Sequence, residues 1–239
     1  MNTMHIALQL KRRTFDLDID LTLPIQGITA LFGPSGSGKT TFLRCLAGLD
    51  QVANGHVRVG KSTWQDGQTF IPTHQRALGY VFQENSLFAH LSVKKNLEYG
   101  LKRCPKERQK YSLEQVVTWL GLSELLKRQP HELSGGQRQK VVIGRAILTS
   151  PELLLMDEPL SNLDQGSKNE ILPYLKQINL EANMPMIYVS HALTEVLYLA
   201  DTLALIDQGH ITAVGKPHDL ANQLDFGFMT SLNSFLNCD

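Results

Sequence analysis

The chain alternates short apolar runs with longer stretches of helix-forming residues. The runs at 28–32, 153–156 and 186–190 are almost continuously apolar, which is the pattern of strands covered on both faces of a sheet. Residues 15–23 alternate apolar and polar positions instead, and this period of two predicts a strand with one face in water. The pattern favours an α/β domain with a mainly parallel sheet and an antiparallel β layer near the N-terminus.

Two further stretches complete the predicted organisation. Residues 203–214 hold two apolar segments around Asp207-Gln208-Gly209, which predicts a hairpin. Residues 112–126 repeat Leu and Val at helical spacing, which predicts a helix. We therefore predict one domain in which an inserted α-helical subdomain interrupts an α/β core. The domain spans 1–239, the core comprises 1–83 and 151–239, and the helical subdomain comprises 84–150.

Composition excludes several classes of protein. The chain has 239 residues with 23 Lys and Arg against 23 Asp and Glu, so it lacks the basic charge of a dedicated nucleic-acid binder. Its apolar runs are far shorter than the roughly 18–20 residues that span a bilayer, and residues 1–10 lack an export signal. Cys45, Cys104 and Cys238 have no CxxC spacing, which is typical of reduced cytosolic thiols. We expect a cytoplasmic protein without a nucleic-acid partner.

A glycine-rich segment follows the first buried strand. It reads GPSGSGKT, fits GxxxxGK[ST], and precedes a helix-like stretch. Glycines allow the backbone N–H groups to wrap phosphates, Lys39 reaches the β- and γ-phosphates, and Thr40 offers a hydroxyl to Mg²⁺. A glycine-rich turn with a solvent-facing lysine is the alternative, which the strand before and the helix after disfavour. The predicted phosphate-binding residues are Gly33, Pro34, Ser35, Gly36, Ser37, Gly38, Lys39, Thr40 and Thr41.

The buried strand at 153–156 leads into two acidic residues, Asp157 and Glu158. A parallel strand delivers such residues to the carboxyl edge of its sheet, where ligands bind. Asp157 is predicted to hold Mg²⁺, and Glu158 to be the general base for an attacking water. The two acids could instead begin a helix, whose dipole favours negative charge there. The phosphate loop makes the catalytic interpretation the stronger one.

Residues 133–137 read LSGGQ and open an amphipathic stretch. A serine and two glycines at a helix start form another anion site, because a hydroxyl, free N–H groups and the helix dipole converge there. The alternative is an ordinary serine N-cap with a flexible entry. One nucleotide does not need two such cradles in one chain.

These segments together resemble the signature of ATP-binding-cassette ATPases, and the resemblance runs through nearly the whole chain in the expected order. The matching motifs are the phosphate loop at 33–40, Gln83 in YVFQ, LSGGQ at 133–137, LLLMDEP at 153–159, SNLD at 161–164 and the pair Ser190-His191. The resemblance implies a P-loop NTPase core that binds ATP and Mg²⁺.

The resemblance also implies a shared site. In such proteins two copies pair head to tail, so the signature of one copy faces the γ-phosphate held by Lys39 of the other. Gln83 would sense Mg²⁺ and the attacking water, Asp164 would lie at the dimer seam, and His191 would contact the γ-phosphate. The signature residues implied to bind nucleotide are Ser134, Gly135, Gly136 and Gln137.

Three of the implied residues have simpler interpretations. A lone glutamine or histidine after an apolar strand is usually a structural group, and only register with the other motifs promotes Gln83 and His191. Phe15 could stack on adenine, since these ATPases usually place an aromatic residue near the N-terminus for that purpose. Its position in an alternating strand makes a core role equally consistent with the pattern.

The resemblance extends to partners. If the chain serves a transporter, separate membrane permease subunits supply the spans and an extracytoplasmic solute-binding protein supplies the solute, as in bacterial importers. Residues 85–93 follow Gln83 and carry Leu87, Phe88 and Leu91, which could form a groove for a short helix of the permease or simply pack the helical region. The expected location is the cytoplasmic face of the inner membrane.

Three stretches narrow the resemblance further, namely residues 21–40, 78–100 and 171–201. They look more like the ATP-binding subunit of molybdate importers than like sugar, polyamine or iron members. Such subunits usually continue into a small β-rich domain, which the sequence up to Asp239 does not include: either the protein lacks this domain or the sequence is truncated. Sulfate, iron or polyamine transport, or a non-transport P-loop ATPase, remain alternatives. No guanine-reading NKxD motif, long coiled-coil insertion or second ATPase unit is present. These absences disfavour a GTPase, a DNA-repair ATPase and a translation-factor cassette, and the presence of Lys39, Asp157, Glu158 and His191 disfavours a binding module with dead catalysis.

Overall fold

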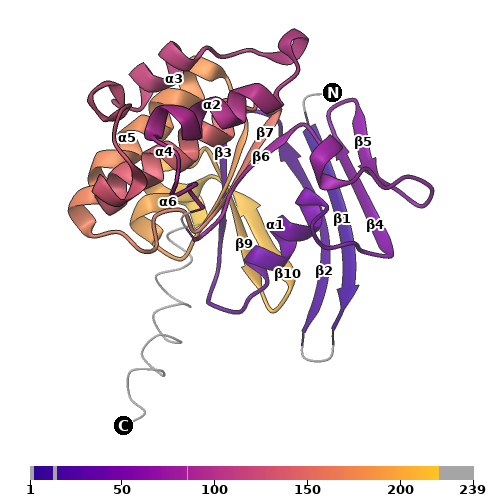
Figure 1. Ribbon diagram of the computed structural model, residues 1–239. Helices are drawn as coiled ribbons and strands as arrows, with labels where there is room; N and C mark the ends of the chain where they lie inside the picture. Colours follow the sequence, from indigo (N-terminus) through magenta and orange to yellow (C-terminus); the bar gives the residue numbers. More distant parts are fainter. Residues whose placement is uncertain (1–2, 13–14, 85, 221–239) are drawn as a thin grey trace.

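The computed structural model describes residues 3–12, 15–84 and 86–220 of the chain, which form two β-sheets and a group of helices (Figure 1). The antiparallel sheet has the strand order β2-β1-β4-β5. Its strands are β1 (Thr3–Lys11), β2 (Asp16–Pro24), β4 (Asn54–Val59) and β5 (Ser62–Gln65).

The second sheet has the strand order β10-β9-β3-β8-β7-β6, with every pairing parallel except that of β9 with β10. Its strands are β3 (Ile28–Phe32), β6 (Leu78–Val81), β7 (Leu153–Asp157), β8 (Met186–Ser190), β9 (Thr202–Asp207) and β10 (His210–Gly215). The order places β3 and β7 on either side of β8, so their carboxyl ends meet at one edge.

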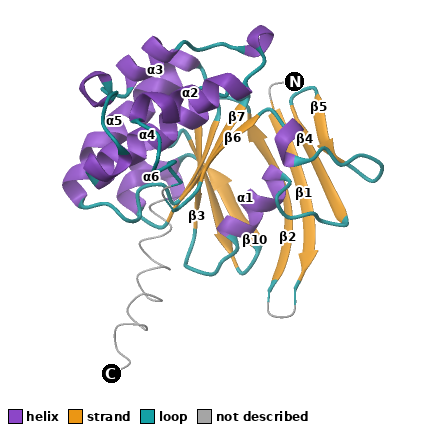
Figure 2. Cartoon of the chain, in the orientation of Figure 1, coloured by secondary structure: helices purple, strands orange, loops and turns teal. Residues whose placement is uncertain are grey.

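The helices lie mostly on one side of this sheet (Figure 2). The α-helices are α1 (Lys39–Ala47), α2 (Val93–Arg103), α3 (Leu113–Trp119), α4 (Gly135–Ile147), α5 (Gln165–Ala182) and α6 (Leu193–Leu199). Short 3-10 helices are η1 (Thr73–Gln75), η2 (Lys106–Arg108), η3 (Ser123–Leu125) and η4 (Pro130–Glu132).

Both faces of the mainly parallel sheet are covered, which explains its continuous apolar strands. Leu153 and Leu155 of β7 pack in a core cluster with α1 and the antiparallel sheet, whereas Leu154 and Met156 pack in a second cluster with α4 and α5. Successive strand residues point to opposite faces, so a doubly covered strand needs apolar residues throughout. The predicted strands 28–32, 153–156 and 186–190 are confirmed.

The strand predicted over 15–23 and the predicted hairpin are also present. In β2, buried residues alternate with exposed ones, and its buried side faces the cluster that contains α1. The strands β9 and β10 are joined at Gln208 and Gly209, which have φ of 45° and 81°. Two successive positive φ values match the twist of a two-residue hairpin.

The helix predicted over 112–126 is wrong in its length. The helix α3 ends at Trp119, and Gly121 has φ of 61°, the left-handed conformation that terminates helices. The N–H of Leu122 then donates to the carbonyl of Val117 at 2.9 Å, and the chain continues into η3. Leu120 and Leu122 are both fully buried, so burial on the two sides of the turn produced the helix-like spacing.

Residues 86–150 contain α2, η2, α3, η3, η4 and α4, and no strand among those that the structure describes. Helix α4 contacts α2, α3 and α5, while α2 and α3 form the outer part of this helical layer. The division into an α/β core and a helical subdomain remains a prediction.

None of the helices in the described ranges has both the length and the apolar character required to cross a membrane.

Cys45 and Cys104 are buried free thiols, and burial raises the pKa of Cys45 to about 11. Cys238 lies outside the described residues.

We expect Gly100→Ala to destabilise the fold by about 1–3 kcal/mol, the usual cost of overpacking. Gly100 lies where α2 approaches α4, and a Cβ there would lie 2.2 Å from the carbonyl oxygen of Arg145. The backbone of α4 cannot give way as a flexible side chain could. Urea unfolding should show the loss, and Gly67→Ala is the control because a Cβ at Gly67 meets nothing within 4 Å. Equal stability of the two variants would contradict this account of the α2–α4 contact.

Candidate functional site

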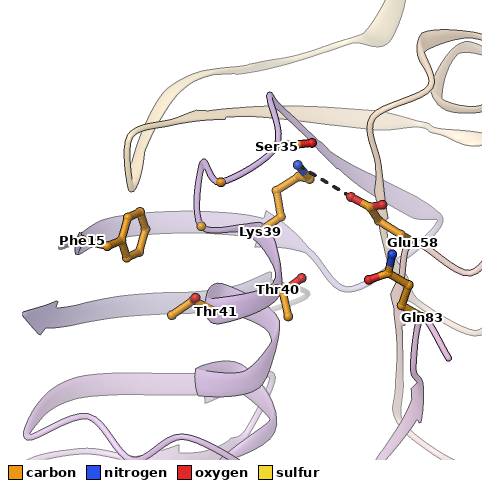
Figure 3. A pocket seen from close by; sticks show the side chains of 9 residues that line it. Phe15, Ser35, Lys39, Thr40, Thr41, Gln83 and Glu158 are labelled. Atoms are coloured by element: carbon orange, nitrogen blue, oxygen red, sulfur yellow. Dashed lines mark ion pairs between the residues drawn. The ribbon is translucent and has the colours of Figure 1, made fainter. Parts of the chain in front are cut away.

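A polar cavity of about 320 Å³ lies over the glycine-rich loop between β3 and α1 (Figure 3). The side chains around it come from the residue before β2, from the loop, from the start of α1 and from the segments that follow β6 and β7. It is lined by Phe15, Ser35, Gly36, Gly38, Lys39, Thr40, Thr41, Gln83 and Glu158. Segments far apart in the chain therefore meet at the carboxyl edge of the sheet, where ligands of such sheets bind.

The loop conformation requires glycine at particular positions. A Cβ on Gly33 would lie 2.0 Å from the carbonyl oxygen of Ile206. Gly38 has φ of 103°, and a Cβ there would lie 2.4 Å from the ring of Phe15. The loop can therefore wrap closely because these residues have no side chain. The hydroxyl of Ser37, which is 3% exposed, has no partner among the described residues and remains available to a ligand of the loop.

Lys39 extends back along the loop. Its Nζ donates to the carbonyl oxygens of Gly33 and Pro34 at 2.9 and 2.8 Å and lies 3.8 Å from Oε1 of Glu158. Burial lowers the pKa of Lys39, while the charges of Glu158 and Asp157 oppose that shift. An ammonium group has three donors, so the bonds to the loop fix its position and leave capacity for a phosphate.

Asp157, the last residue of β7, is held by two hydroxyl groups. Thr40 donates to its Oδ1 at 3.0 Å, and Tyr80 donates to its Oδ2 at 3.2 Å. Burial raises the pKa of Asp157, and these hydrogen bonds counteract the rise. A threonine hydroxyl beside a carboxylate is a set of hard oxygen donors, which fits Mg²⁺.

Glu158 lies at the centre of the arrangement. Its Oε2 is 3.1 Å from Nδ1 of His191, and the side chain is 16% exposed. The residue has φ of 44°, an unusual conformation for a residue other than glycine. Its N–H donates to the carbonyl of Val189 in β8 at 3.1 Å, so the sheet fixes where the carboxylate lies. Gln83, which follows β6, lies beside it in Figure 3.

Phe15 lies at the other end of the cavity, beside the start of α1 (Figure 3). It is half-buried, and it packs against the core cluster of the antiparallel sheet while also lining the cavity. Core packing and an exposed ring face are therefore combined in one residue. Its predicted contact with adenine remains a prediction.

The signature residues do not line this cavity. Ser134 is the N-cap of α4: its hydroxyl accepts from the N–H of Gln137 at 3.2 Å, and Gln137 Oε1 accepts from the N–H of Ser134 at 3.1 Å. Gly135 and Gly136 form the first turn. Asp164 caps α5 by accepting from the N–H of Ser167 at 3.0 Å. These residues carry out capping within one chain, and the structure does not bring them to Lys39.

Tyr80 and Gly209 are contributors that the sequence patterns did not indicate. Tyr80 lies in β6, beside β7, and its bond to Asp157 depends on strand order. The N–H of Gly209 donates to the carbonyl of Ser37 at 3.0 Å, so the β9–β10 turn supports the glycine-rich loop. The one sequence signal for Tyr80 is its place in YVFQ, three residues before the candidate site residue Gln83.

The fold and this edge of the sheet define a P-loop nucleotide-binding domain. A family model described as ABC transporter matches residues 17–161, and the chain belongs to that family. It is 56% identical over 213 residues to the molybdenum import ATP-binding protein ModC 1 of Azotobacter vinelandii, covering 88% of this chain and 59% of that protein. The chain thus spans about three fifths of the length of the curated relatives it matches.

Solved structures share the fold. MJ1267, an ATP-binding cassette of an ABC transporter, has a TM-score of 0.81 at 24% identity, covering 98% of this chain and 99% of that chain. The ATP-binding cassette MJ0796, solved as a dimer bound to ADP and Pi, has a TM-score of 0.72 at 24% identity, covering 90% and 98%. The predicted fold class is confirmed: a P-loop core with a mainly parallel sheet, an antiparallel β layer and inserted helices.

Proposed function

We propose that this chain is the ATP-binding and ATP-hydrolysing subunit of an importer for molybdate or a similar oxyanion. The observation that supports it most is the carboxylate of Glu158, which lies 3.8 Å from Lys39 and 3.1 Å from His191 beside a glycine-rich loop. This arrangement fits hydrolysis of a nucleoside triphosphate, because Glu158 can act as the base, Lys39 can bind a phosphate and His191 can orient the reacting groups.

Each residue has a distinct proposed role in this reaction. The N–H groups of the loop, Lys39 and the start of α1 bind the phosphates, and Phe15 packs on adenine. Glu158 accepts a proton from the attacking water, and His191 orients the γ-phosphate and that water. Mg²⁺, held through Thr40 and Asp157 with Gln83 nearby, would neutralise charge on the phosphate oxygens.

The signature residues and Asp164 are proposed to act in a homodimer around two ATP molecules. Within one chain Ser134 lies outside the phosphate cavity, at the exposed start of α4. A second copy would supply the missing cradle to each site, as in a head-to-tail pair. The ATP-binding cassette MJ0796, which shares this fold, was solved as a dimer bound to ADP and Pi, and this supports the pairing of two copies.

Membrane permease subunits are proposed to dock beside the loop that follows Gln83. A shallow cavity of about 240 Å³ there is lined by side chains that include Phe88, Tyr99 and Arg145. Arg145 lies 4.9 Å over the ring of Phe88 and donates to Ser86 at 2.9 Å. Aromatic rings with a fixed guanidinium suit a short helix with an apolar face. Asn85, part of the segment expected to dock, lies outside the described residues.

The proposed substrate and location come from the relatives. The name of the Azotobacter vinelandii protein states molybdenum import, and it is 56% identical to this chain. We therefore propose molybdate as the solute, delivered by an extracytoplasmic solute-binding protein, and a position at the cytoplasmic face of the inner membrane. Sulfate, iron and polyamines are the competing solutes.

We expect deletion of the encoding gene to lower molybdate uptake by its host, and a plasmid copy of the wild-type gene to restore it. A Lys39→Ala copy should not restore uptake, because the phosphates lose their cation. Uptake of labelled molybdate, sulfate, iron and polyamine should be measured in parallel. Restoration by Lys39→Ala would refute the proposed use of ATP, and loss of another solute instead of molybdate would refute the substrate assignment.

A further inference from the structure

The buried carboxylate of Glu195 is hydrogen-bonded to Ser190, the residue that precedes His191. Glu195 of α6 is 4% exposed, and both of its oxygens are occupied. Its Oε2 accepts from the hydroxyl of Tyr188 at 2.7 Å and from that of Ser190 at 2.8 Å, and its Oε1 pairs with Nζ of Lys168 at 2.9 Å. None of these side chains lines the phosphate cavity, and no role proposed above uses Glu195.

The network reaches the backbone on both sides of His191. Ser190, whose hydroxyl donates to Glu195, also accepts from the N–H of Ala192 at 3.0 Å. Ser190 is the last residue of β8, where it pairs with Phe32 of β3. His191 directly follows β8. The N–H of the next residue, Ala192, donates to the hydroxyl of Ser190, and the bond of that hydroxyl to Glu195 fixes its orientation.

His191 needs such support because its own side chain has little. It is 53% exposed, and its Nδ1 lies 3.1 Å from Oε2 of Glu158, the hydrogen bond that holds the ring. A single hydrogen bond can hold an exposed ring only if the backbone places that ring within reach of its partner. The position of the imidazole therefore depends on the 190–192 backbone.

The tyrosine that donates to Glu195 keeps its proton. Burial, followed by the charge of Glu195, raises the pKa of Tyr188 well above its ordinary value, so its hydroxyl keeps its proton and donates. Lys168 lies in the first turn of α5, where its N–H donates to the carbonyl of Asp164 at 3.0 Å. The carboxylate therefore connects the start of α5 with the end of β8.

We propose that Glu195 is a positioning residue that holds the Ser190–Ala192 backbone against α5 and thereby places His191 on Glu158. This inference rests on the proposed ATP hydrolysis, since the effect on turnover is transmitted through His191. Removing the carboxylate leaves two hydroxyls and an ammonium without their acceptor, which frees the 190–192 segment to move.

The kinetic test is a double-mutant cycle between Glu195→Ala and His191→Ala. We expect Glu195→Ala to lower kcat about 10–100-fold, as loss of an outer support typically does, with the ATP dissociation constant unchanged. In the His191→Ala background the same substitution should have no further effect, because the group it positions is gone. Glu195→Gln, which keeps an acceptor oxygen for the hydroxyls, should recover part of the lost kcat.

Two controls separate positioning from folding. Lys140→Met breaks a buried ion pair elsewhere in the fold, the one between Lys140 of α4 and Glu170 of α5 at 2.7 Å. This variant should leave kcat unchanged. Ser190→Ala removes the hydroxyl link alone and should reproduce the loss of kcat if Glu195→Ala fails to fold. An equal fold-loss from Glu195→Ala with and without His191 would overturn the proposal.

A second readout needs no nucleotide. Imidazole ¹⁵N spectra of the full chain, with the His191 signals assigned by their loss in His191→Ala, should show the Nδ1 hydrogen bond in the wild type and its loss in Glu195→Ala or Ser190→Ala. Unchanged His191 signals in both variants would overturn the proposal. A wild-type chain without ATPase activity would refute the proposed function instead, and these spectra would still decide whether Glu195 positions His191.

Discussion

Replacement of Glu158 by Gln should lower ATP turnover by about 10²–10⁴-fold, the usual contribution of a general base. The amide keeps the size of the side chain but cannot accept a proton from the attacking water. Lys39, the glycine-rich loop and Thr40 are untouched, so ATP binding should persist. The positive φ of Glu158 is retained as well, because the backbone is held by the bond from its N–H to Val189.

The measurement combines steady-state phosphate release with size-exclusion chromatography in ATP and Mg²⁺. We expect the Glu158→Gln chain to accumulate as an ATP-bound dimer, because hydrolysis no longer releases the two copies. Glu170→Gln is the matched control: its side chain is 61% exposed on α5 and does not line the phosphate cavity. Turnover equal to that of the wild type would exclude Glu158 as the base.

A mixture of two inactive chains should recover activity if the nucleotide site is shared between copies. One chain carries Ser134→Arg and keeps Lys39, and the other carries Lys39→Ala and keeps Ser134. In a head-to-tail heterodimer one site then has both residues intact and the other has neither. Ser134 lies outside the cavity of its own chain, so complementation requires the partner.

The expected recovery is about a quarter of wild-type turnover at equal mixing, because half of the dimers are mixed and each has one intact site. Each chain alone should be inactive in the same assay. The control replaces the second chain by the Lys39→Ala, Ser134→Arg double variant, which leaves no intact site in any dimer. Heterodimers that form on size exclusion yet stay as inactive as their parents would contradict the shared site.

Much of the phosphate site could be predicted from local sequence because its chemistry is local. The segment GPSGSGKT occupies one loop between β3 and α1, and the glycines are needed where their neighbours leave no room for a Cβ. Asp157 and Glu158 follow a strand whose apolar residues already indicated burial on both faces. At this site the apolar pattern of the strands and the short motifs that follow them indicate the same few residues.

Other elements escaped prediction for identifiable reasons. Strand β1 was not anticipated, although it is the central partner of β2 and β4. The helix at 112–126 was overextended, because buried leucines on both sides of Gly121 imitate one continuous helical face. Leucines cannot indicate by spacing alone which of two neighbouring turns they belong to, and the left-handed glycine decides it.

Sequence alone determined which residue types are available at this site: a loop that must be glycine-rich, a lysine, two acids, a glutamine and a histidine, each in a recognisable local pattern. Tertiary structure decided which of them meet. The order β3-β8-β7-β6 brings Lys39, Glu158 and His191 together and adds Tyr80, while Ser134 and Asp164 cap helices outside the cavity. The physical reason is that strand order and the direction of each side chain depend on contacts between distant segments, which no local pattern encodes.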